Sequence, residues 1–327
     1  MRSFDVTSIC NALMDILIEV DDTDLQKLGL TKGIMHLVDS KRQADVLNYF
    51  ARKTSVTELG GSSLNAIRTL SQLGHSTFFA GMISDDLYGA RIKTRLDQLN
   101  IASNLGGHAT ESTGTCIILI TPDGERTMNT NLGASRLYTK AEVPKAQILN
   151  SRIFHFSGYQ WDTAEQKSAL LEALELCKKN DKTVSFDLAD PFVVDRNRTD
   201  FESLIKDYAD IVFANKEEAK ILYHSSPEIA AAKIASSGAI AVVKLGGEGA
   251  MVCQGDRCDM IAPVSTKVID TTGAGDMFAA GFLHGVLKGQ STAVSGKIAA
   301  TLASDVISRV GATVSKSALD TALGISR

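Results

Sequence analysis

The second half of this 327-residue chain alternates between short apolar runs and amphipathic segments, and this alternation restricts the fold more than any other feature. Runs rich in β-branched and aromatic residues predict strands, and the segments between them predict helices. Since parallel strands need long crossover connections, usually helices, the pattern predicts a mostly parallel sheet covered by helices. The predicted strands are 152–157, 183–188, 211–214 and 240–245, and the predicted helices are 164–179, 199–206, 216–222 and 226–236.

Several polar residues and glycines follow the carboxyl ends of these predicted strands, which is where ligands bind in open sheets of this kind. Asp187, Asn215 and Gly246 all fall at such ends. Asn215 also begins a predicted helix with Glu218 three residues later, so the pair could be a capping box as well as part of a ligand site. Gly246 and Gly249 lie in the next turn, where glycines let a ligand approach the backbone.

The stretch 270–283, DTTGAGDMFAAGFL, runs from a turn of small residues directly into an apolar helix. Gly273, Ala274 and Gly275 leave backbone N–H groups uncovered, and the helix start adds unpaired donors and positive potential, so the turn suits an anion. Asp276 lies in the middle of this site. Its carboxylate could cap the helix, or it could be a general base that takes a proton from a hydroxyl while the amides hold a phosphoryl group.

The first half of the chain predicts a second, smaller sheet outside the α/β core. Its strands come from about 11–20, 33–38 and 104–131, and the last segment contains a hairpin signal at Pro122-Asp123-Gly124. On the returning strand, Arg126 is predicted to be a solvated hairpin charge.

Two further positions suggest ligand contacts in this half. Asp15 could be a turn residue, or its carboxylate could accept hydrogen bonds from two adjacent hydroxyl groups of a ligand. Gly60 and Gly61 precede a predicted helix, and Asn65, one turn in, offers both a donor and an acceptor. The alternative for this segment is a tight strand-to-helix turn with a surface asparagine.

Composition excludes several classes of protein. A hydrophobic content of 44%, a charged content of 22% and a net charge of −4 are typical of a globular protein without a nucleic-acid or membrane partner. No signal-peptide pattern or membrane-length apolar run is present, so a cytoplasmic location is expected. Cys253 and Cys258 are expected on adjacent strands. In a reducing cytosol we expect no disulfide between them, and none at the other three cysteines. Neither G-x-G-x-x-G nor a P-loop motif occurs.

Taken together, the motifs resemble those of the PfkB (ribokinase-like) sugar and nucleoside kinases. The matching segments run in the family's order over nearly the whole chain: N-x-x-x-D at 11–15, G-G-x-x-x-N at 60–65, the hairpin, N-x-x-E at 215–218, L-G-x-x-G at 245–249 and D-T-T-G-A-G-D at 270–276. The resemblance implies a single kinase domain over 1–327, with a three-layer α/β/α ribokinase-like core and the small sheet as a lid. It also implies transfer of the ATP γ-phosphoryl group to a hydroxymethyl group of a sugar or nucleoside, with Mg²⁺.

The resemblance assigns a role to each matching residue. The base is Asp276, and the anion hole is formed by Gly273, Ala274 and Gly275. Substrate binding falls to Asn11, Asp15, Gly60, Gly61 and Asn65, and ATP binding to Asp187, Asn215, Lys244, Gly246 and Gly249. Glu218 belongs to the magnesium environment, and Asp270, Thr272, Gly311 and Ser315 match positions that ligate a monovalent cation such as K⁺ in several relatives.

Some positions depart from the commoner family pattern. Lys244 stands where many members carry a small hydroxyl residue. Ser62 and Ser63 replace glycine or small apolar residues, and this replacement favours the adenosine-kinase-like branch. Phe154 and Trp161 belong to an aromatic group near a strand end that could stack on a base or belong to the core. The expected partner is a small sugar or nucleoside, and the chain is expected to be a monomer or a homodimer. The alternative is a non-catalytic sugar- or nucleotide-sensing protein, against which the intact Asp276 and G-A-G turn argue.

Overall fold

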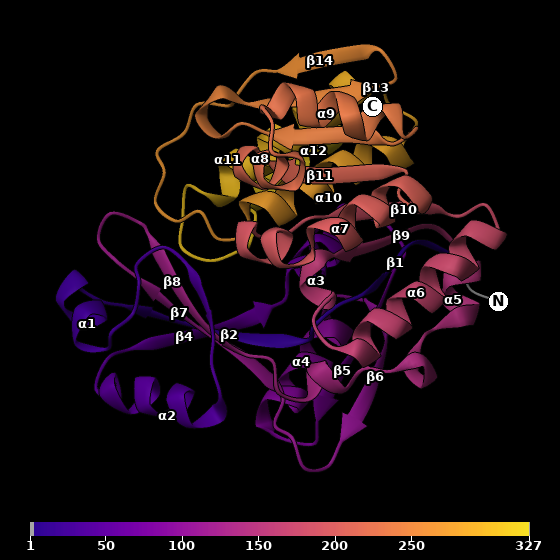
Figure 1. Cartoon of the computed structure of the whole chain (residues 1–327). Coiled ribbons are helices and arrows are strands. Elements are labelled where there is room, and N and C mark those ends of the chain that lie inside the picture. The colour runs from indigo at the N-terminus through magenta and orange to yellow at the C-terminus, as the bar shows by residue number, and fades with distance from the viewer. Residues whose placement is uncertain (1–2, 327) are drawn as a thin grey trace.

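The structure is a computed structural model that describes residues 3–326. These residues form a nine-stranded sheet with helices on both faces and a five-stranded sheet to one side of it, as Figure 1 shows. The three-layer core and the small second sheet are therefore confirmed.

The large sheet has the strand order β14-β13-β12-β11-β10-β9-β1-β5-β6. Pairing is parallel from β12 to β6, while β13 and β14 form an antiparallel hairpin at one edge. Strands β5, β11 and β12 carry mostly apolar runs, which is typical of a sheet covered on both faces. The strands are β1 Phe4–Ile9, β5 Thr77–Ser84, β6 Ala102–His108, β9 Ser151–Ser157, β10 Thr183–Asp187, β11 Ile211–Asn215, β12 Ile240–Lys244, β13 Ala250–Gln254 and β14 Arg257–Ile261.

Two separate apolar clusters cover the two faces of this sheet. One face packs against α5 Lys145–Leu149, α6 Ala164–Lys179, α7 Pro191–Asp207, α8 Lys216–Tyr223 and α9 Pro227–Ser236. The other packs against α3 Ser62–Gln72, α4 Leu87–Gln98, α10 Ala274–Leu287 and α11 Thr292–Val306, with α12 Lys316–Ile325 packed on α11. The remaining turns include the 3₁₀ helices η1 Gly133–Leu137, η2 Lys140–Glu142, η3 Gly158–Gln160 and η4 Gly246–Glu248.

Helix α7 begins earlier than the expected 199–206 segment. Asp190 caps it, Pro191 occupies its first turn, and its backbone departs from helical geometry only at Asn197. Proline suits the first helical position because its missing N–H would be unpaired there anyway.

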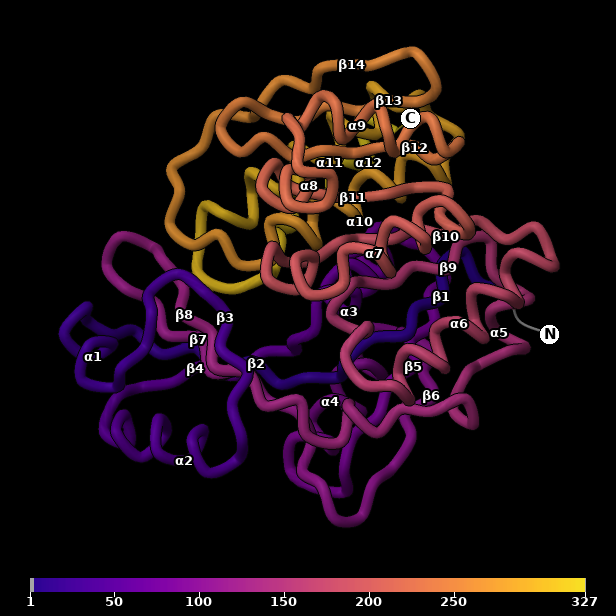
Figure 2. Tube along the Cα trace, viewed as in Figure 1, coloured from indigo at the N-terminus to yellow at the C-terminus, as the bar shows by residue number. Residues whose placement is uncertain are grey.

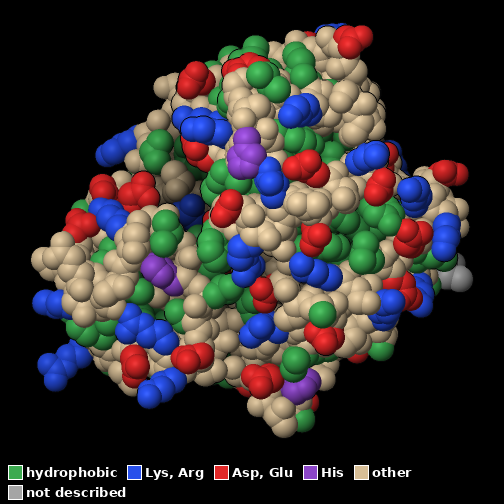
Figure 3. Space-filling model, in the orientation of Figure 1, with side chains coloured by type: hydrophobic (Ala, Val, Ile, Leu, Met, Phe, Trp, Pro, Cys, Tyr) green, Lys and Arg blue, Asp and Glu red, His purple; other side chains and the backbone are tan. Residues whose placement is uncertain are grey.

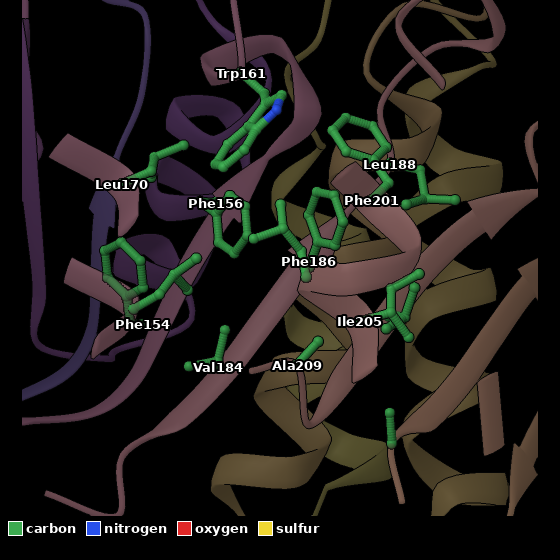
Figure 4. Packing of buried hydrophobic residues seen from close by; sticks show 14 of the residues in the cluster. Phe154, Phe156, Trp161, Leu170, Val184, Phe186, Leu188, Phe201, Ile205 and Ala209 are labelled. Atoms are coloured by element: carbon green, nitrogen blue, oxygen red, sulfur yellow. The ribbon is translucent and has the colours of Figure 1, made fainter. Parts of the chain in front are cut away.

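The aromatic residues near the end of β9 belong to the core (Figure 4). Phe156 stacks on Phe186 with ring centroids 4.6 Å apart, and Phe201 meets Phe186 edge-on at 5.0 Å. Phe154 and Trp161 are buried in the same cluster. Of the two alternatives left open for this group, the structure therefore shows core packing for Phe154 and Trp161.

Truncating the centre of this cluster should destabilise the fold strongly. Phe186 is 0% exposed and has an aromatic neighbour on either side. We expect Phe186→Ala to lower the free energy of unfolding by about 3–5 kcal/mol, through lost burial and the cavity left behind. Chemical denaturation measures the change. The control is Phe192→Ala on the same helix layer, where the ring is 51% exposed and a change below about 1 kcal/mol is expected. Equal effects of the two variants would contradict the assignment of Phe186 to the core.

The small sheet has the order β3-β8-β7-β2-β4. One of its faces is covered by α1 and α2, where Ile16, Ile18 and Ile117 pack on Leu25 and Val46. Figure 2 shows how segments distant in the chain, indigo and magenta, lie side by side here. The elements are β2 Leu13–Glu19, α1 Asp22–Lys27, β3 Met35–Leu37, α2 Ser40–Tyr49, β4 Ser55–Gly60, β7 Gly114–Ile120 and β8 Arg126–Asn131.

The composition of this sheet differs from the predicted one in two ways. Strand β4 pairs antiparallel with β2 and belongs to the small sheet, although it was not assigned to it from the sequence. Residues 104–108, predicted within the small sheet, lie in β6 and pair parallel with β5 at the edge of the large sheet. The reason is that α4 makes the crossover from β5 to β6, which returns the chain beside β5.

The expectation that Cys253 and Cys258 are unbonded is wrong in this structure, where they form a disulfide. The two residues lie directly opposite each other on β13 and β14, with Cα atoms 4.1 Å apart. The hairpin register therefore brings the thiols together. The remaining cysteines, Cys10, Cys116 and Cys177, are free as predicted, and all three are buried.

The surface shows acidic and basic side chains interspersed on the face seen in Figure 3. Within residues 3–326 no helix combines the length and the apolar character needed to cross a bilayer.

Candidate active site

The turn before α10 is open to a ligand. Gly273 is the N-cap residue of α10 and has a positive φ of 74°, and residues 273–276 are all half-buried. Within residues 3–326, the N–H groups of Gly275 and Asp276 have no hydrogen-bond acceptor. Two unpaired donors at a helix start make a site for an anion, to which the helix dipole adds positive potential.

Asp276 lies in the first turn of α10 and does not cap the helix. Its carboxylate accepts hydrogen bonds from another helix instead, from Ser62 Oγ at 2.7 Å and from Asn65 Nδ2 at 2.9 Å. Burial raises the pKa of Asp276, although these two hydrogen bonds oppose the shift. The Asp276 carboxylate is thus held in place by α3, beside the two unpaired backbone N–H groups.

The start of α3 brings the predicted glycine-rich segment to this carboxylate. Gly61 is the N-cap residue with a φ of 102°, and a Cβ at this position would clash with the carbonyl oxygen of Asn11, so glycine is required. The amide of Asn65 is buried, and while its nitrogen binds Asp276, its oxygen has no hydrogen-bond partner in the described residues. A buried unpaired acceptor next to Asp276 suits a ligand hydroxyl that donates a hydrogen bond to it.

Asp15 lies on β2 against Gly60 of the neighbouring strand. A Cβ at Gly60 would clash with the Asp15 carboxylate, so the missing side chain makes the room for it. Burial raises the pKa of Asp15 to about 7, and the nearby Arg68 opposes this shift. Asp15, Asn65 and Asp276 therefore belong to one group of interacting polar residues.

Both ends of the Asn11 side-chain amide are hydrogen-bonded to other residues of the protein. Its nitrogen donates to the carbonyl oxygen of Tyr159 at 3.0 Å, and its oxygen accepts from Gln166 at 2.9 Å. The structure thus places the Asn11 backbone against Gly61, while the amide is directed to other partners.

Lys244 reaches the anion turn from the end of β12. Its Nζ lies 3.6 Å from Asp187 Oδ2, and a Cβ at Gly275 would lie 3.1 Å from the same Nζ. Burial disfavours the charged ammonium, but Asp187, Glu218 and Asp276 outweigh it, so the pKa of Lys244 is raised. A charged lysine beside unpaired amides adds to the positive potential of the turn.

Asn215 and Glu218 form a complete capping box at the start of α8. Asn215 donates from its backbone N and from Nδ2 to the two oxygens of Glu218, at 2.7 and 2.6 Å. Burial raises the pKa of Glu218 to about 7. The capping alternative is therefore observed, and it places a buried carboxylate near Asp187 and Lys244.

The two predicted glycines of the next turn, Gly246 and Gly249, differ. A Cβ at Gly246 would meet no atom within 4 Å, so this side of η4 is open. A Cβ at Gly249 would clash with the carbonyl oxygen of Ile261, so this glycine is required by the packing of β13 and β14. Of these two glycines, Gly246 lies where a ligand could approach, and the neighbouring Gly247 is open in the same way.

The prediction that Arg126 is a solvated hairpin charge is wrong. Its side chain is 22% exposed, its Nε lies 3.5 Å from Asp270 Oδ1, and it donates to Thr271 Oγ1 at 3.3 Å. At the tip of the same hairpin, a Cβ at Gly124 would clash with the carbonyl oxygen of Ile269. The small sheet therefore touches the segment leading into the anion turn.

Of the residues matched to a cation site, Asp270, Thr272 and Gly311 are hydrogen-bonded to one another, whereas Ser315 is bonded to a different carboxylate. Both oxygens of Asp270 already accept hydrogen bonds, Oδ1 from Thr272 and Oδ2 from the Gly311 N–H at 2.8 Å. Ser315 caps α12 and binds another carboxylate, Asp305, at 2.7 Å. This donor set does not fit a monovalent cation as it stands, and we derive no step through one.

Two polar residues of the site were not predicted as such. Ser62 binds Asp276, and Arg68 is buried on the same helix, one turn after Asn65. The helical spacing of Asn65 and Arg68 is the signal that could have revealed the second, since residues three apart share a helix face.

Fold and site together are those of a phosphoryl-transfer enzyme: an α/β sheet edge with an anion turn, a carboxylate and a lysine. The chain matches the sequence profile described as pfkB family carbohydrate kinase over residues 23–319. An uncharacterized sugar kinase of Archaeoglobus fulgidus is 29% identical over 248 residues, which are 74% of this chain and 96% of that protein.

Solved structures agree with this match. A probable sugar kinase from Rhizobium etli superimposes with a TM-score of 0.93 at 31% identity, covering 99% of this chain and 100% of the other. The adenosine kinase from Sinorhizobium meliloti superimposes with a TM-score of 0.92 at 32% identity, covering 98% and 99%. The chain belongs to the pfkB family of carbohydrate kinases, and it is an ATP-dependent kinase of sugars or nucleosides.

Proposed function

We propose that this chain transfers the γ-phosphoryl group of ATP to the hydroxymethyl group of a ribose-bearing nucleoside, with a free sugar as the second candidate. The serines at Ser62 and Ser63 and the similarity to an adenosine kinase at 32% identity favour the nucleoside. The similar sugar kinases keep the free sugar as an alternative.

One observation carries the proposal: the two ends of the Asn65 amide. The nitrogen holds Asp276 at 2.9 Å, and the buried oxygen has no partner among residues 3–326. A sugar hydroxyl that donates to this oxygen would satisfy it. The same contact would place the sugar next to the Asp276 carboxylate, which Asn65 also binds. Asp15 would accept hydrogen bonds from further hydroxyls of the sugar.

In the proposed mechanism, Asp276 takes the proton from the attacking hydroxyl. The free N–H groups of Gly275 and Asp276, together with Lys244, stabilise the negative charge on the transferring phosphoryl group. Since phosphoryl transfer asks the protein mainly for positioning and charge stabilisation, this arrangement supplies the main requirements. The raised pKa of Asp276 also suits a base that must hold a proton during the reaction.

For the nucleotide, we propose the sheet edge near Asp187, Asn215 and Gly246, with Lys244 toward the phosphates. Within residues 3–326, no group of three or more His, Cys, Asp or Glu residues could hold a metal by itself. The buried carboxylate of Glu218 still fits Mg²⁺, which is commonly held by phosphates, waters and one or two carboxylates. When bound, Mg²⁺ would shield the phosphate charges.

We propose further that the chain is one kinase domain in which the small sheet acts as a lid. The contacts of Arg126 with Asp270 and Thr271, and of Gly124 with Ile269, support this role because they join the hairpin to the anion turn. A lid that closes here would exclude water from the reacting groups.

A direct assay tests the proposed function. Purified protein is incubated with ATP and Mg²⁺ and, one by one, adenosine, other nucleosides, ribose and fructose, and phosphorylated product is measured. We expect turnover with a nucleoside above that with any free sugar. Binding of an acceptor, seen as a thermal shift, without phosphorylated product would instead favour the non-catalytic sensing alternative.

A further inference from the structure

The disulfide between Cys253 and Cys258 plays no part in the proposed function. It joins β13 to β14 within one hairpin, and the two residues are separated by 5 positions in the sequence. Strand β14 is the last strand of the large sheet and lies at its outer edge in Figure 1. Residues 254–258, which form the turn and the start of β14, are all exposed. The disulfide therefore reaches the protein surface at its Cys258 end.

The two cysteines of this pair have different surroundings. Cys253 is 0% exposed and belongs to the apolar cluster on the face covered by α5 to α9. Cys258 is exposed, and so is Met260, which lies two residues later on the same side of β14. Helix α9 packs on β12 and β13, and the exposure of Cys258 and Met260 shows that its cover ends before β14. A reagent from solution can therefore reach Cys258, whereas Cys253 is shielded.

The other three cysteines allow a comparison within the same chain. Cys10, Cys116 and Cys177 are free and buried. Burial raises the pKa of Cys10 to about 11 and the pKa of Cys177 to about 12, and it raises the pKa of Cys116 as well. Since the thiolate is the nucleophile in thiol–disulfide exchange, buried thiols of this kind are inert. Among residues 3–326, Cys258 is the one exposed cysteine.

The hairpin has other contacts that do not depend on the disulfide. Thr292 on α11 donates from Oγ1 to Asp259 Oδ2 at 3.1 Å. Ile261 packs so closely on α11 that a Cβ at Gly296 would lie 2.6 Å from its side chain. A disulfide that closes so short a loop also restricts the unfolded chain less than one that closes a long loop. We therefore expect the fold to tolerate both the oxidised and the reduced pair.

We propose that Cys253 and Cys258 form a reversible thiol–disulfide exchange site for a small-molecule thiol or its disulfide, such as glutathione. Cys258 is the residue that exchanges with the small molecule, and Cys253 is the resolving residue that forms the internal bond. This inference goes beyond the proposed function and does not depend on it.

The exchange takes place in two steps. In the oxidising direction, the thiolate of reduced Cys258 attacks glutathione disulfide. The S–S bond of that molecule breaks, a mixed disulfide forms at Cys258, and one glutathione leaves as a thiol. Cys253 lies directly opposite, with the two Cα atoms 4.1 Å apart, and attacks the Cys258 sulfur, which releases the second glutathione. The electrons and protons lost by the two protein thiols thus reduce glutathione disulfide to two glutathione molecules, and reduction of the protein reverses the same steps.

Thiol counting tests the proposal on the wild-type protein. The protein is reduced, freed of reductant and treated in its native state with glutathione disulfide, and its free thiols are counted after denaturation. We expect the count to fall from five to three, which are the cysteines free in the structure. Mass spectrometry should find no stable glutathione adduct, because Cys253 displaces it. A rapid acid quench at early times should trap the adduct on Cys258.

Two variants separate the roles of the two cysteines. In Cys253→Ala the resolving thiol is absent, so we expect one stable glutathione adduct, located at Cys258 by peptide mass spectrometry. In Cys258→Ala we expect modification of Cys253 to be slower by on the order of 100-fold or more, because a buried thiol reacts only when the fold opens locally. The matched control is Cys177→Ala, which replaces a buried cysteine away from the hairpin and should still lose two thiols without a stable adduct.

A thermal melt of the wild-type protein tests the site without any variant. We expect the reduced form to stay folded, with a Tm lower than that of the oxidised form by about 5 °C or less. Unfolding on reduction would overturn the proposal, because the disulfide would then be a structural link. It would equally be overturned if the wild-type protein kept all its thiols, or if Cys253 in Cys258→Ala reacted as fast as Cys258 in Cys253→Ala.

Discussion

Asp276→Asn is expected to lower kcat by about three to four orders of magnitude while the protein stays folded. Asparagine has nearly the same shape, but its amide cannot accept the proton of the attacking hydroxyl, and a positioned general base contributes about 10²–10⁴-fold, with further loss from the changed hydrogen bonds. Ser62 can still donate to the asparagine oxygen, because the side chain occupies the same place. Single-turnover kinetics with saturating ATP and acceptor measure the effect.

The matched control for this variant is Asp320→Asn. Asp320 lies on α12, and its exposed side chain pairs with Lys316 at 2.8 Å. It has no role in the proposed site. Exposed pairs of this kind contribute little, so both turnover and stability should remain at the wild-type level. Near-wild-type turnover of Asp276→Asn would show that another group takes the proton.

Gly60→Ala is expected to raise the KM for the acceptor by about 100-fold or more. The new Cβ would clash with the carboxylate of Asp15, which is buried and has little room to move. Displacing the carboxylate removes a charged acceptor from the hydroxyl groups of the substrate, and each charged hydrogen bond is worth about 1.5–3 kcal/mol. Initial rates at varied acceptor concentration measure KM and kcat separately.

Gly107→Ala is the control for this substitution. Gly107 also lies in a strand, β6, and a Cβ there would meet no atom within 4 Å. It therefore reproduces the glycine-to-alanine change without the clash, and we expect unchanged kinetics. Should Gly60→Ala behave like Gly107→Ala, Asp15 would not be the residue that binds the acceptor.

Much of the fold could be predicted because the strand and helix signals are local. The alternation after residue 148 predicted β9 to β12 of the large sheet, and β10, β11 and β12 lie within two residues of their predicted bounds. The placement of β4 and β6 could not be predicted in the same way. Both are strands by local pattern, but which sheet a strand joins depends on long-range pairing.

The site shows the same division between local and long-range information. The anion turn and the helix after it are contiguous in sequence, so both could be located from residues 270–283. The partners of Asp276 lie more than 200 positions away, at Ser62 and Asn65, and only the packing of α3 beside α10 brings them together. Arg126 was wrongly expected in solvent because a hairpin looks exposed until something packs against it.

By itself, the amino-acid order determined the class of this protein, because motifs made of consecutive residues carry their backbone geometry and chemistry with them. Tertiary structure alone decided which charges are compensated. The burial of Asp15 against Gly60, the reach of Lys244 to the anion turn and the contact of Arg126 with Asp270 all arise between segments distant in the chain. Burial and charge separation are properties of the packed molecule, and they set the pKa of each group only once the chain has folded.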